Sequence, residues 1–191
     1  NDDEFVWFFL MLIAAGNEST RTITTQGMRL LMENPEQLQY LVDNPDKIPG
    51  ACEEMLRYNT AFTLMRRQCI EDTEVAGKLI KKGDKVIMHY HTVNHDETIF
   101  GADAMQFDVR RAERMPDLYN QHRSFGIGQH FCLGTHLARL EMRVMFEEII
   151  PRLRHPKLVG DVAYTRSNLV NGIKRMHITF DPEVKSSKAV A

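Results

Sequence analysis

An isolated cysteine lies in a glycine-rich loop that leads directly into a predicted helix, and this feature limits the fold more than any other. The loop reads SFGIGQHFCLG from Ser124 to Gly134, and Cys132 has no second cysteine near it. Backbone N–H groups at a helix N-terminus favour a negatively charged sulfur. The glycines leave room for a flat, bulky group to approach the backbone. The pattern therefore indicates a nucleophile, a metal or cofactor ligand, or a buried bystander thiol.

The composition is that of an ordinary soluble globular protein. The chain has 191 residues, of which 43% are hydrophobic and 26% charged, with a net charge of −2. This charge gives no reason to expect nucleic acid as a partner. Three widely spaced cysteines argue against a disulfide framework and fit a reducing compartment, so we expect a cytoplasmic protein. The longest apolar run, 5–15, is too short to cross a bilayer and predicts a buried helix.

The order of predicted elements indicates a mainly α fold with small β-sheets (α+β). Hydrophobic periodicity, capping residues and turn residues define this order. We expect helices at 2–33, 35–42 and 48–59, short strands over 63–94, an irregular stretch at 94–128, a helix at 133–154 and strands over 158–180 with a turn near 171–172. A long irregular stretch inside a compact domain is usually functional.

The cysteine loop resembles the heme-binding motif of cytochromes P450, F-x-x-G-x-[RH]-x-C-x-G. That family is the standard example of heme iron held by a cysteine thiolate. The resemblance implies heme b (iron protoporphyrin IX) as cofactor, with Cys132 as the axial ligand of the iron and His130 as a partner of a heme propionate. The other heme contacts that it implies in this loop are Phe125, Gly126, Gly128 and Gly134.

Two other interpretations of the cysteine remain open at this point. A lone cysteine is most often a small buried side chain without chemical function. A zinc site could recruit His130, Cys132 and His136, but it lacks a clear fourth ligand and a pair of closely spaced cysteines. Zinc therefore ranks below heme.

The segment EEMLR contains Glu54 and Arg57, which are three residues apart and so share one helix face. Such pairs are common and are weak evidence alone. Cytochromes P450, however, carry an E-x-x-R pair between the central helix and the cysteine loop, where a third residue locks to it. The segment FDVRR resembles the region of that third residue. We expect Arg111 in this structural role, with Arg110 as the alternative; a solvated arginine is the simpler interpretation.

The segment AAGNEST resembles the central-helix motif of the family, [AG]-G-x-[DE]-T. We expect Gly16 to permit a local opening of the helix, which would place Glu18 and Ser19 side by side as a catalytic acid–alcohol pair. Such a pair delivers protons before the O–O bond breaks. Serine replaces the usual threonine and lacks the methyl group that fixes the rotamer, so Thr20 is a possible partial substitute. The alternative is that these polar side chains face solvent.

Further contacts follow from the resemblance alone. An arginine on the first strand of the small sheet pairs with a propionate, because its planar fork matches a carboxylate. Arg67 fits this position best, Arg66 is the alternative, and Ala15 is expected beside the heme. The implied substrate pocket is mainly apolar, which suits a lipophilic ligand, although each residue could equally be ordinary core. Its residues are Ala14, Phe62, Thr63, Leu64, Met65, Leu169 and Val170.

The resemblance extends over essentially the whole chain. We expect residues 1–191 to be the C-terminal part of a single cytochrome P450 domain whose N-terminal half is absent. Two departures stand out: the usual proline after E-x-x-R is missing, and the stretch 113–123 lengthens the loop before the cysteine. In its wider sequence the chain is most similar to bacterial members that act on steroids, terpenoids or alkyl chains.

The resemblance implies an oxidoreductase. The expected reaction is insertion of one oxygen atom from dioxygen into a C–H bond of a lipophilic substrate, such as a steroid, a terpenoid or an alkyl chain. Electrons would come from NAD(P)H through a ferredoxin or a flavoprotein reductase. Two alternatives stay open: a peroxide-using or isomerase-type heme-thiolate enzyme, and a non-catalytic heme-binding protein or truncated relic.

Overall fold

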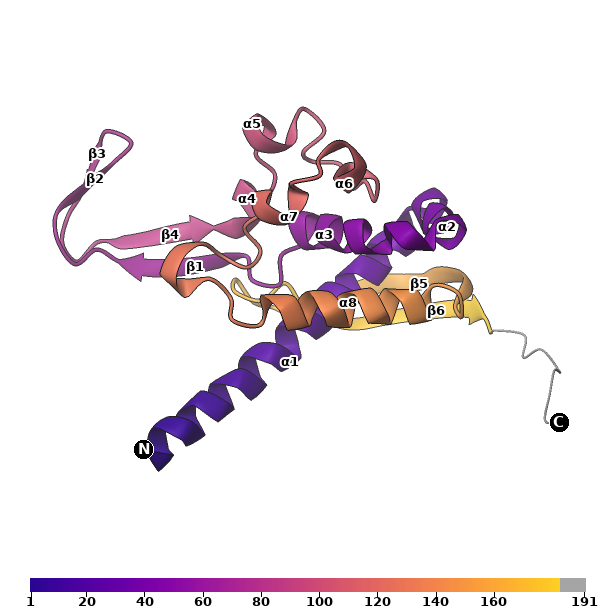
Figure 1. Ribbon diagram of the computed structural model, residues 1–191, viewed down its shortest axis with the longest axis horizontal. Helices are drawn as coiled ribbons and strands as arrows, with labels where there is room; N and C mark the ends of the chain where they lie inside the picture. The colour runs from indigo at the N-terminus through magenta and orange to yellow at the C-terminus, as the bar shows by residue number, and fades with distance from the viewer. Residues whose placement is uncertain (183–191) are drawn as a thin grey trace.

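The computed structural model describes residues 1–182 and places three two-stranded ribbons around a helical body (Figure 1). The first helix, α1 (Asp2–Glu33), begins with a capping box. The Asn1 side chain accepts a hydrogen bond from the Glu4 N–H, and the Glu4 carboxylate accepts one from the backbone amine of Asn1. Both contacts satisfy groups that a helix start leaves unpaired. The predicted helix at 2–33 is confirmed.

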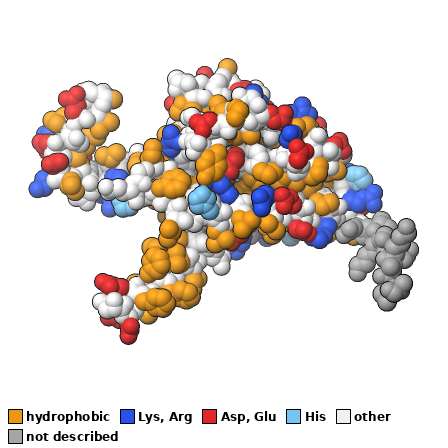
Figure 2. Space-filling view, in the orientation of Figure 1, with side chains coloured by type: hydrophobic (Ala, Val, Ile, Leu, Met, Phe, Trp, Pro, Cys, Tyr) orange, Lys and Arg blue, Asp and Glu red, His pale blue; other side chains and the backbone are white. Residues whose placement is uncertain are grey.

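The two halves of α1 have different environments. The C-terminal half is buried among other elements, with Ile23, Leu30 and Leu31 in the core. The N-terminal half extends away from the body and carries a dense group of apolar side chains (Figures 1 and 2). The burial predicted for 5–15 is not found in this chain, since Phe5 is 68% exposed and Trp7 is 72% exposed. Among residues 1–182, none of the helices combines the length and apolar character needed to cross a membrane.

The core lies where α1 meets the neighbouring helices. The chain continues from α1 into α2 (Pro35–Asp43), a 3₁₀ turn (Pro45–Lys47) and α3 (Ile48–Tyr58). α3 packs against both α1 and α8 (Thr135–Ile149). A Cβ placed on Gly27 of α1 would lie 2.6 Å from the Met55 sulfur. Glycine therefore permits α1 to approach α3 closely at the centre of the core.

All three ribbons are antiparallel. β1 (Leu64–Gln68) pairs with β4 (Lys85–His89), β2 (Thr73–Val75) with β3 (Lys78–Ile80), and β5 (Arg154–Tyr164) with β6 (Ile173–Asp181). The β2–β3 hairpin projects from the far end of the β1–β4 ribbon, whereas β5–β6 lies beside α1 (Figure 1). The predicted mainly α fold with small sheets is confirmed.

Four single helical turns interrupt the irregular stretch between β4 and the cysteine loop. They are α4 (Tyr90–Val93), α5 (Glu97–Phe100), α6 (Arg111–Arg114) and α7 (Leu118–Gln121). Their small apolar centre consists of Phe100, Ala104 and Leu118. The prediction of an irregular segment at 94–128 is therefore confirmed, with short turns in place of regular structure.

The predicted helix at 133–154 is too long at both ends. α8 starts at Thr135 with Gly134 as its N-cap and ends at Ile149. Pro151 has no N–H to continue the helical ladder, so the chain turns there and β5 begins at Arg154. The final ribbon is consequently longer than the predicted strands over 158–180.

Candidate functional site

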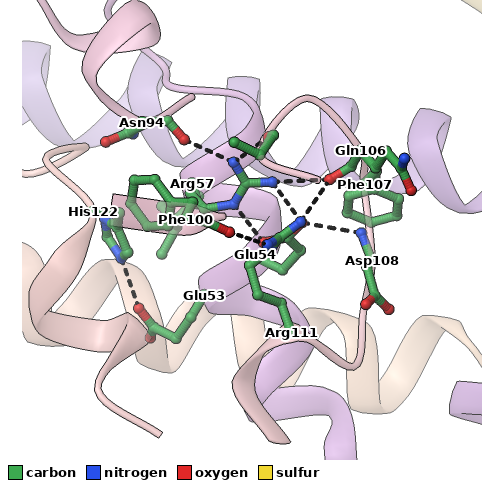
Figure 3. A network of polar contacts seen from close by, with 12 residues as sticks. Glu53, Glu54, Arg57, Asn94, Phe100, Gln106, Phe107, Asp108, Arg111 and His122 are labelled. Carbon is green, nitrogen blue, oxygen red and sulfur yellow. Dashed lines mark hydrogen bonds and ion pairs between the residues drawn. The ribbon is translucent and has the colours of Figure 1, made fainter. Parts of the chain in front are cut away.

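A fully buried ion pair on α3 is the centre of the polar network drawn in Figure 3. Arg57 Nε donates to Glu54 Oε2 at 2.7 Å, and Arg57 Nη2 donates to Glu54 Oε1 at 2.8 Å. Arg111 brings its Nε within 3.1 Å of Glu54 Oε2, and the Asp108 N–H donates to Glu54 Oε1 at 3.0 Å. Two guanidinium groups thus surround one carboxylate, and the extra hydrogen bonds offset the cost of burying these charges.

The same arginines fix the backbone of the irregular stretch. Arg57 donates to the carbonyl oxygens of Asn94 at 2.7 Å and Ala104 at 2.8 Å. Both Arg57 and Arg111 also donate to the Gln106 carbonyl, at 3.0 and 3.1 Å. Buried carbonyl groups need such donors. The network therefore determines the path of the chain from α4 to α6.

The structure distinguishes the two adjacent arginines that the sequence offered as third members of the network. Arg111 is 1% exposed and lies against Glu54. Arg110 is exposed and places its guanidinium 4.1 Å from the centre of the Tyr40 ring, outside the network. Arg111 is accordingly the residue brought together with Glu54 and Arg57.

Asn94 connects this network to the start of the cysteine loop. Its side-chain oxygen accepts a hydrogen bond from the Arg123 N–H at 2.7 Å, and its amide nitrogen donates to Ser124 Oγ at 2.9 Å. Ser124 Oγ in turn donates to the Leu56 carbonyl at 2.6 Å. The loop thus starts from a point that is tied to α3, one residue away from Arg57.

The cysteine loop is closed on itself and open toward solvent. The Phe125 carbonyl accepts a hydrogen bond from the Cys132 N–H at 2.9 Å, which joins the two ends of the loop. Gly126 and Gly128 have φ values of 77° and 73°, a left-handed region that suits glycine. Cys132 and His130 are both exposed.

These residues fit a thiolate ligand of a flat group. A Cβ on Gly128 would have nothing within 4 Å, and a Cβ on Gly134 would lie 3.9 Å from the Cys132 sulfur. Gly134 therefore leaves the position beside the exposed thiol free of a side chain, and Gly128 faces open space. Across residues 1–182 no three His, Cys, Asp or Glu side chains gather closely enough to hold a metal ion, so the zinc alternative has no ligand set there.

The central segment of α1 differs from the expectation. The predicted local opening at Gly16 is wrong, because α1 stays helical through it. Ser19 Oγ donates to the Ala15 carbonyl one turn earlier at 2.7 Å, and Glu18 pairs with Arg21 on the same helix face. Both side chains thus make contacts within the helix. Ala14 and Ala15 are exposed, and Thr20 is half-buried.

Two distant segments of the expected substrate pocket lie side by side. Phe62 and Val170 form an isolated antiparallel bridge, and the Thr63 N–H donates to the Leu169 carbonyl at 2.9 Å. The turn that contains them also approaches α1, since a Cβ on Gly172 would lie 3.6 Å from Glu18 Oε1. Leu64 and Met65 are half-buried at the start of β1, whereas Arg66 and Arg67 are exposed further along it.

Comparison with known proteins identifies the family. Residues 1–158 match the sequence model of the family described as "Cytochrome P450". The chain belongs to the cytochrome P450 family. It is 36% identical over 180 residues to linalool 8-monooxygenase of Pseudomonas putida, covering 94% of this chain and 43% of that protein. It is 38% identical over 184 residues to a steroid C26-monooxygenase of Mycolicibacterium smegmatis, covering 95% and 44%.

Solved structures of cytochromes P450 have the same fold. Substrate-free CYP109E1 from Bacillus megaterium matches with a TM-score of 0.88 at 31% identity, covering 96% of this chain and 46% of that one. Cytochrome P450 CREJ matches with a TM-score of 0.87 at 32% identity, covering 95% and 44%. The chain thus spans less than half the length of the cytochromes P450 that it matches.

Sequence reasoning missed four polar residues of this cytochrome P450 chain, namely Glu53, Asn94, His122 and Arg139. Asn94 is fully buried, and no local pattern distinguishes it from a surface asparagine. Glu53 directly precedes the E-x-x-R pair, and Arg139 lies one turn into the helix that follows the cysteine loop. The signal that could have found these two is a charged residue at a position expected to face the core.

Proposed function

We propose that this chain provides the cysteine loop and the central helix of a heme-thiolate monooxygenase. The observation that supports this most is the exposed Cys132 in an open glycine loop, tied through Asn94 to a buried ion-pair network. Such bracing suits a thiolate ligand, because a ligand must stay in place while its metal changes charge. Membership of the cytochrome P450 family supports the same activity.

The loop residues have distinct roles in this proposal. Cys132 would hold the heme iron through its thiolate, and His130 and Arg67 would bind the propionates. Phe125 and the three glycines Gly126, Gly128 and Gly134 would lie against the flat face, with Ala15 on the other side. Bound heme supplies the redox chemistry that activates dioxygen.

Glu18 and Ser19 are the proposed proton-delivering groups. The Glu18–Arg21 pair is exposed, with 42% and 67% of the two side chains accessible. Exposed pairs contribute only about 0–1 kcal/mol, so the carboxylate is free to exchange partners. Ser19 Oγ keeps an acceptor site while it donates to Ala15. The two groups together hold and pass protons, with Thr20 as a neighbouring hydroxyl.

The proposed substrate is lipophilic: a steroid, a terpenoid or an alkyl chain. The apolar residues at Phe62, Leu64, Met65, Leu169 and Val170, with Ala14 and Thr63, support this class, as do the relatives named linalool 8-monooxygenase and steroid C26-monooxygenase. We further propose electron supply from NAD(P)H through a ferredoxin or a flavoprotein reductase, and a cytoplasmic location that keeps Cys132 reduced.

The test uses the protein expressed from its complete gene and the spectrum of its reduced carbon-monoxide complex. We expect Cys132→Ser to abolish the red-shifted Soret band, because that band would require a cysteine thiolate as a ligand of the iron. Cys69→Ser is the control, since Cys69 directly follows β1, outside the cysteine loop, and its replacement should leave the band unchanged. Survival of the band in Cys132→Ser would refute the ligand assignment.

Turnover distinguishes the proposal from its alternatives. With a surrogate ferredoxin and reductase, a monooxygenase consumes NAD(P)H and forms an oxygenated product from a steroid, terpene or alkane that shifts the heme spin state. Product formed only with added peroxide would favour a peroxide user. A normal Soret band without product under either condition would favour a non-catalytic heme protein.

A further inference from the structure

The glutamate next to Glu54 belongs to a second, separate polar cluster. Arg139 Nε donates to Glu53 Oε1 at 2.8 Å, and Arg139 Nη2 donates to Glu53 Oε2 at 3.0 Å. His122 Nε2 lies 2.9 Å from the same Oε2. The side chain of Glu53 is 13% exposed, that of Arg139 is 12% exposed and that of His122 is 1% exposed. Figure 3 shows Glu53 and His122 directed away from the Glu54 network, so the adjacent glutamates serve different parts of the chain.

Arg139 uses its whole guanidinium group in this cluster. Besides the bidentate bond to Glu53, Nη1 donates to Thr135 Oγ1 at 2.8 Å and Nη2 donates to the Tyr119 carbonyl at 3.2 Å. The guanidinium carbon lies 3.7 Å from the centre of the Tyr119 ring and 4.6 Å from that of Phe125. A planar guanidinium that is both bidentate and stacked cannot be replaced by lysine without loss of contacts.

The Glu53 carboxylate is held in its charged form. Burial alone would raise its pKa, but the hydrogen bonds from His122 and Arg139 outweigh burial and lower the pKa below the usual value. A half-buried carboxylate therefore faces a half-buried guanidinium in a two-point contact. Such a pair is strongly directional and fixes the position of both side chains.

Phe125 contacts both this cluster and the backbone of Cys132. Its ring lies under the Arg139 guanidinium and has its centre 6.0 Å from that of the His122 ring. Its carbonyl accepts the hydrogen bond from the Cys132 N–H at 2.9 Å. A shift of Arg139 would therefore move Phe125, and with it the backbone of the cysteine.

We propose that Glu53, His122 and Arg139 form a clamp that positions Phe125 and, through it, the Cys132 thiolate. The inference rests on the proposed function, because it concerns the sulfur as a heme ligand. These residues are positioning residues, since they touch neither heme nor substrate in this proposal. The clamp ties α3, the end of α7 and the first turns of α8 to the cysteine loop, whereas the Glu54 network holds the stretch 94–111.

The test compares substitutions at Arg139 with a matched substitution on the same helix, in the heme-loaded protein expressed from its complete gene. Arg139→Gln removes the charge and the fork, whereas Arg139→Lys keeps the charge alone. Arg143→Gln is the control, because Arg143 lies one turn further along α8 and pairs with Glu147 at 3.7 Å on the exposed surface. The two measurements are the heme reduction potential and the rate at which mild denaturant abolishes the red-shifted carbon-monoxide band.

We expect the band to disappear about tenfold faster or more in Arg139→Gln, the scale of a lost hydrogen bond between charged groups. Arg139→Lys should be intermediate, and Arg143→Gln should match the parent protein. The reduction potential should be more positive in Arg139→Lys than in the parent protein, and more positive still in Arg139→Gln. The reason is that a poorly placed thiolate donates less electron density to the iron.

Unchanged potentials in both Arg139 variants would overturn the inference, even if both were less stable, because a purely structural residue predicts that result. If Arg139→Gln does not fold, the reduction potential is measured in Arg139→Lys and Phe125→Leu instead. A potential equal to that of the parent protein in both variants would refute the clamp. A parent protein without the red-shifted band would refute the proposed function itself. If only the clamp inference is wrong, the parent protein still shows that band.

Discussion

Removal of the Arg57 guanidinium should unfold the protein rather than only lower its turnover rate. In Arg57→Ala, Glu54 keeps Arg111 at 3.1 Å but loses a bidentate partner at 2.7 and 2.8 Å. Loss of one partner of a buried ion pair costs about 3–5 kcal/mol. The carbonyls of Asn94 and Ala104 also lose their donor from Arg57, and each unsatisfied buried group costs about 1–3 kcal/mol.

These losses together reach about 5–11 kcal/mol, against a typical folding stability of about 5–15 kcal/mol. We therefore expect Arg57→Ala to yield insoluble or heme-free protein. Arg57→Lys keeps a charge beside Glu54 and should lose less, because its ammonium can still donate to the carboxylate. The Lys variant should fold with reduced stability and provide a measurable unfolding transition.

The assay is urea unfolding of the purified protein followed by circular dichroism, with heme content measured in parallel. Arg143→Ala is the control: it removes an exposed guanidinium whose partner is equally exposed, and should cost less than about 1 kcal/mol. If Arg57→Ala unfolded within about 1 kcal/mol of the control, the reasoning from buried, multiply bonded charge would be refuted.

The acid–alcohol pair and a pair of histidines provide the remaining predictions. Glu18→Gln and Ser19→Ala should keep heme bound but divert electrons from product to hydrogen peroxide; equal ratios of product to NAD(P)H in variants and parent would remove the assignment. Burial lowers the pKa of both His91 and His95 below the usual 6.5. Below pH 6.5 the folded state then binds fewer protons at these histidines than the unfolded state does. The free energy of unfolding therefore falls as the pH decreases from 6.5 toward the folded pKa, and the two histidines do not reduce it at higher pH. We expect the urea midpoint to decrease between about pH 7 and about pH 5, and to decrease less in His95→Gln; an equal decrease in that variant would contradict the assignment.

Local patterns predicted the parts of the molecule that depend on neighbouring residues. The helix at 2–33 follows from its capping residues and periodicity, and the short strands expected over 63–94 are present as β1 to β4. The end of α8 was misplaced because apolar periodicity continues past Ile149, whereas Pro151 determines where the ladder stops. At Gly16 a glycine permits an opening but does not require one, since Ser19 and Glu18 find partners within the intact helix.

Local patterns did not predict the contacts between distant residues; the expectation of Arg111 beside Glu54, which the structure confirms, came from the family resemblance. Arg110 and Arg111 are adjacent and alike in type, so only the path of the chain in space decides which of them faces Glu54. The hydrogen bond from Arg139 to Glu53 joins residues that are 86 positions apart. Neither the E-x-x-R motif nor the cysteine-loop motif contains either residue. Glu53 is one position from Glu54, yet a helix turns far enough between neighbours to direct the two carboxylates into different networks.

The different environments of the three cysteines make this chain suitable for selective chemical labelling. Cys52 is 2% exposed in the core, and burial raises the pKa of its thiol to about 12, which leaves almost no reactive thiolate at neutral pH. Cys69 is half-buried and its Sγ lies 2.8 Å from the Glu71 carbonyl. Cys132 is exposed. A maleimide added to a partly heme-loaded preparation should therefore react first at Cys132 of the heme-free molecules. The fraction of Cys132 that is alkylated then measures the share of molecules with a vacant cysteine loop, independently of any absorbance spectrum.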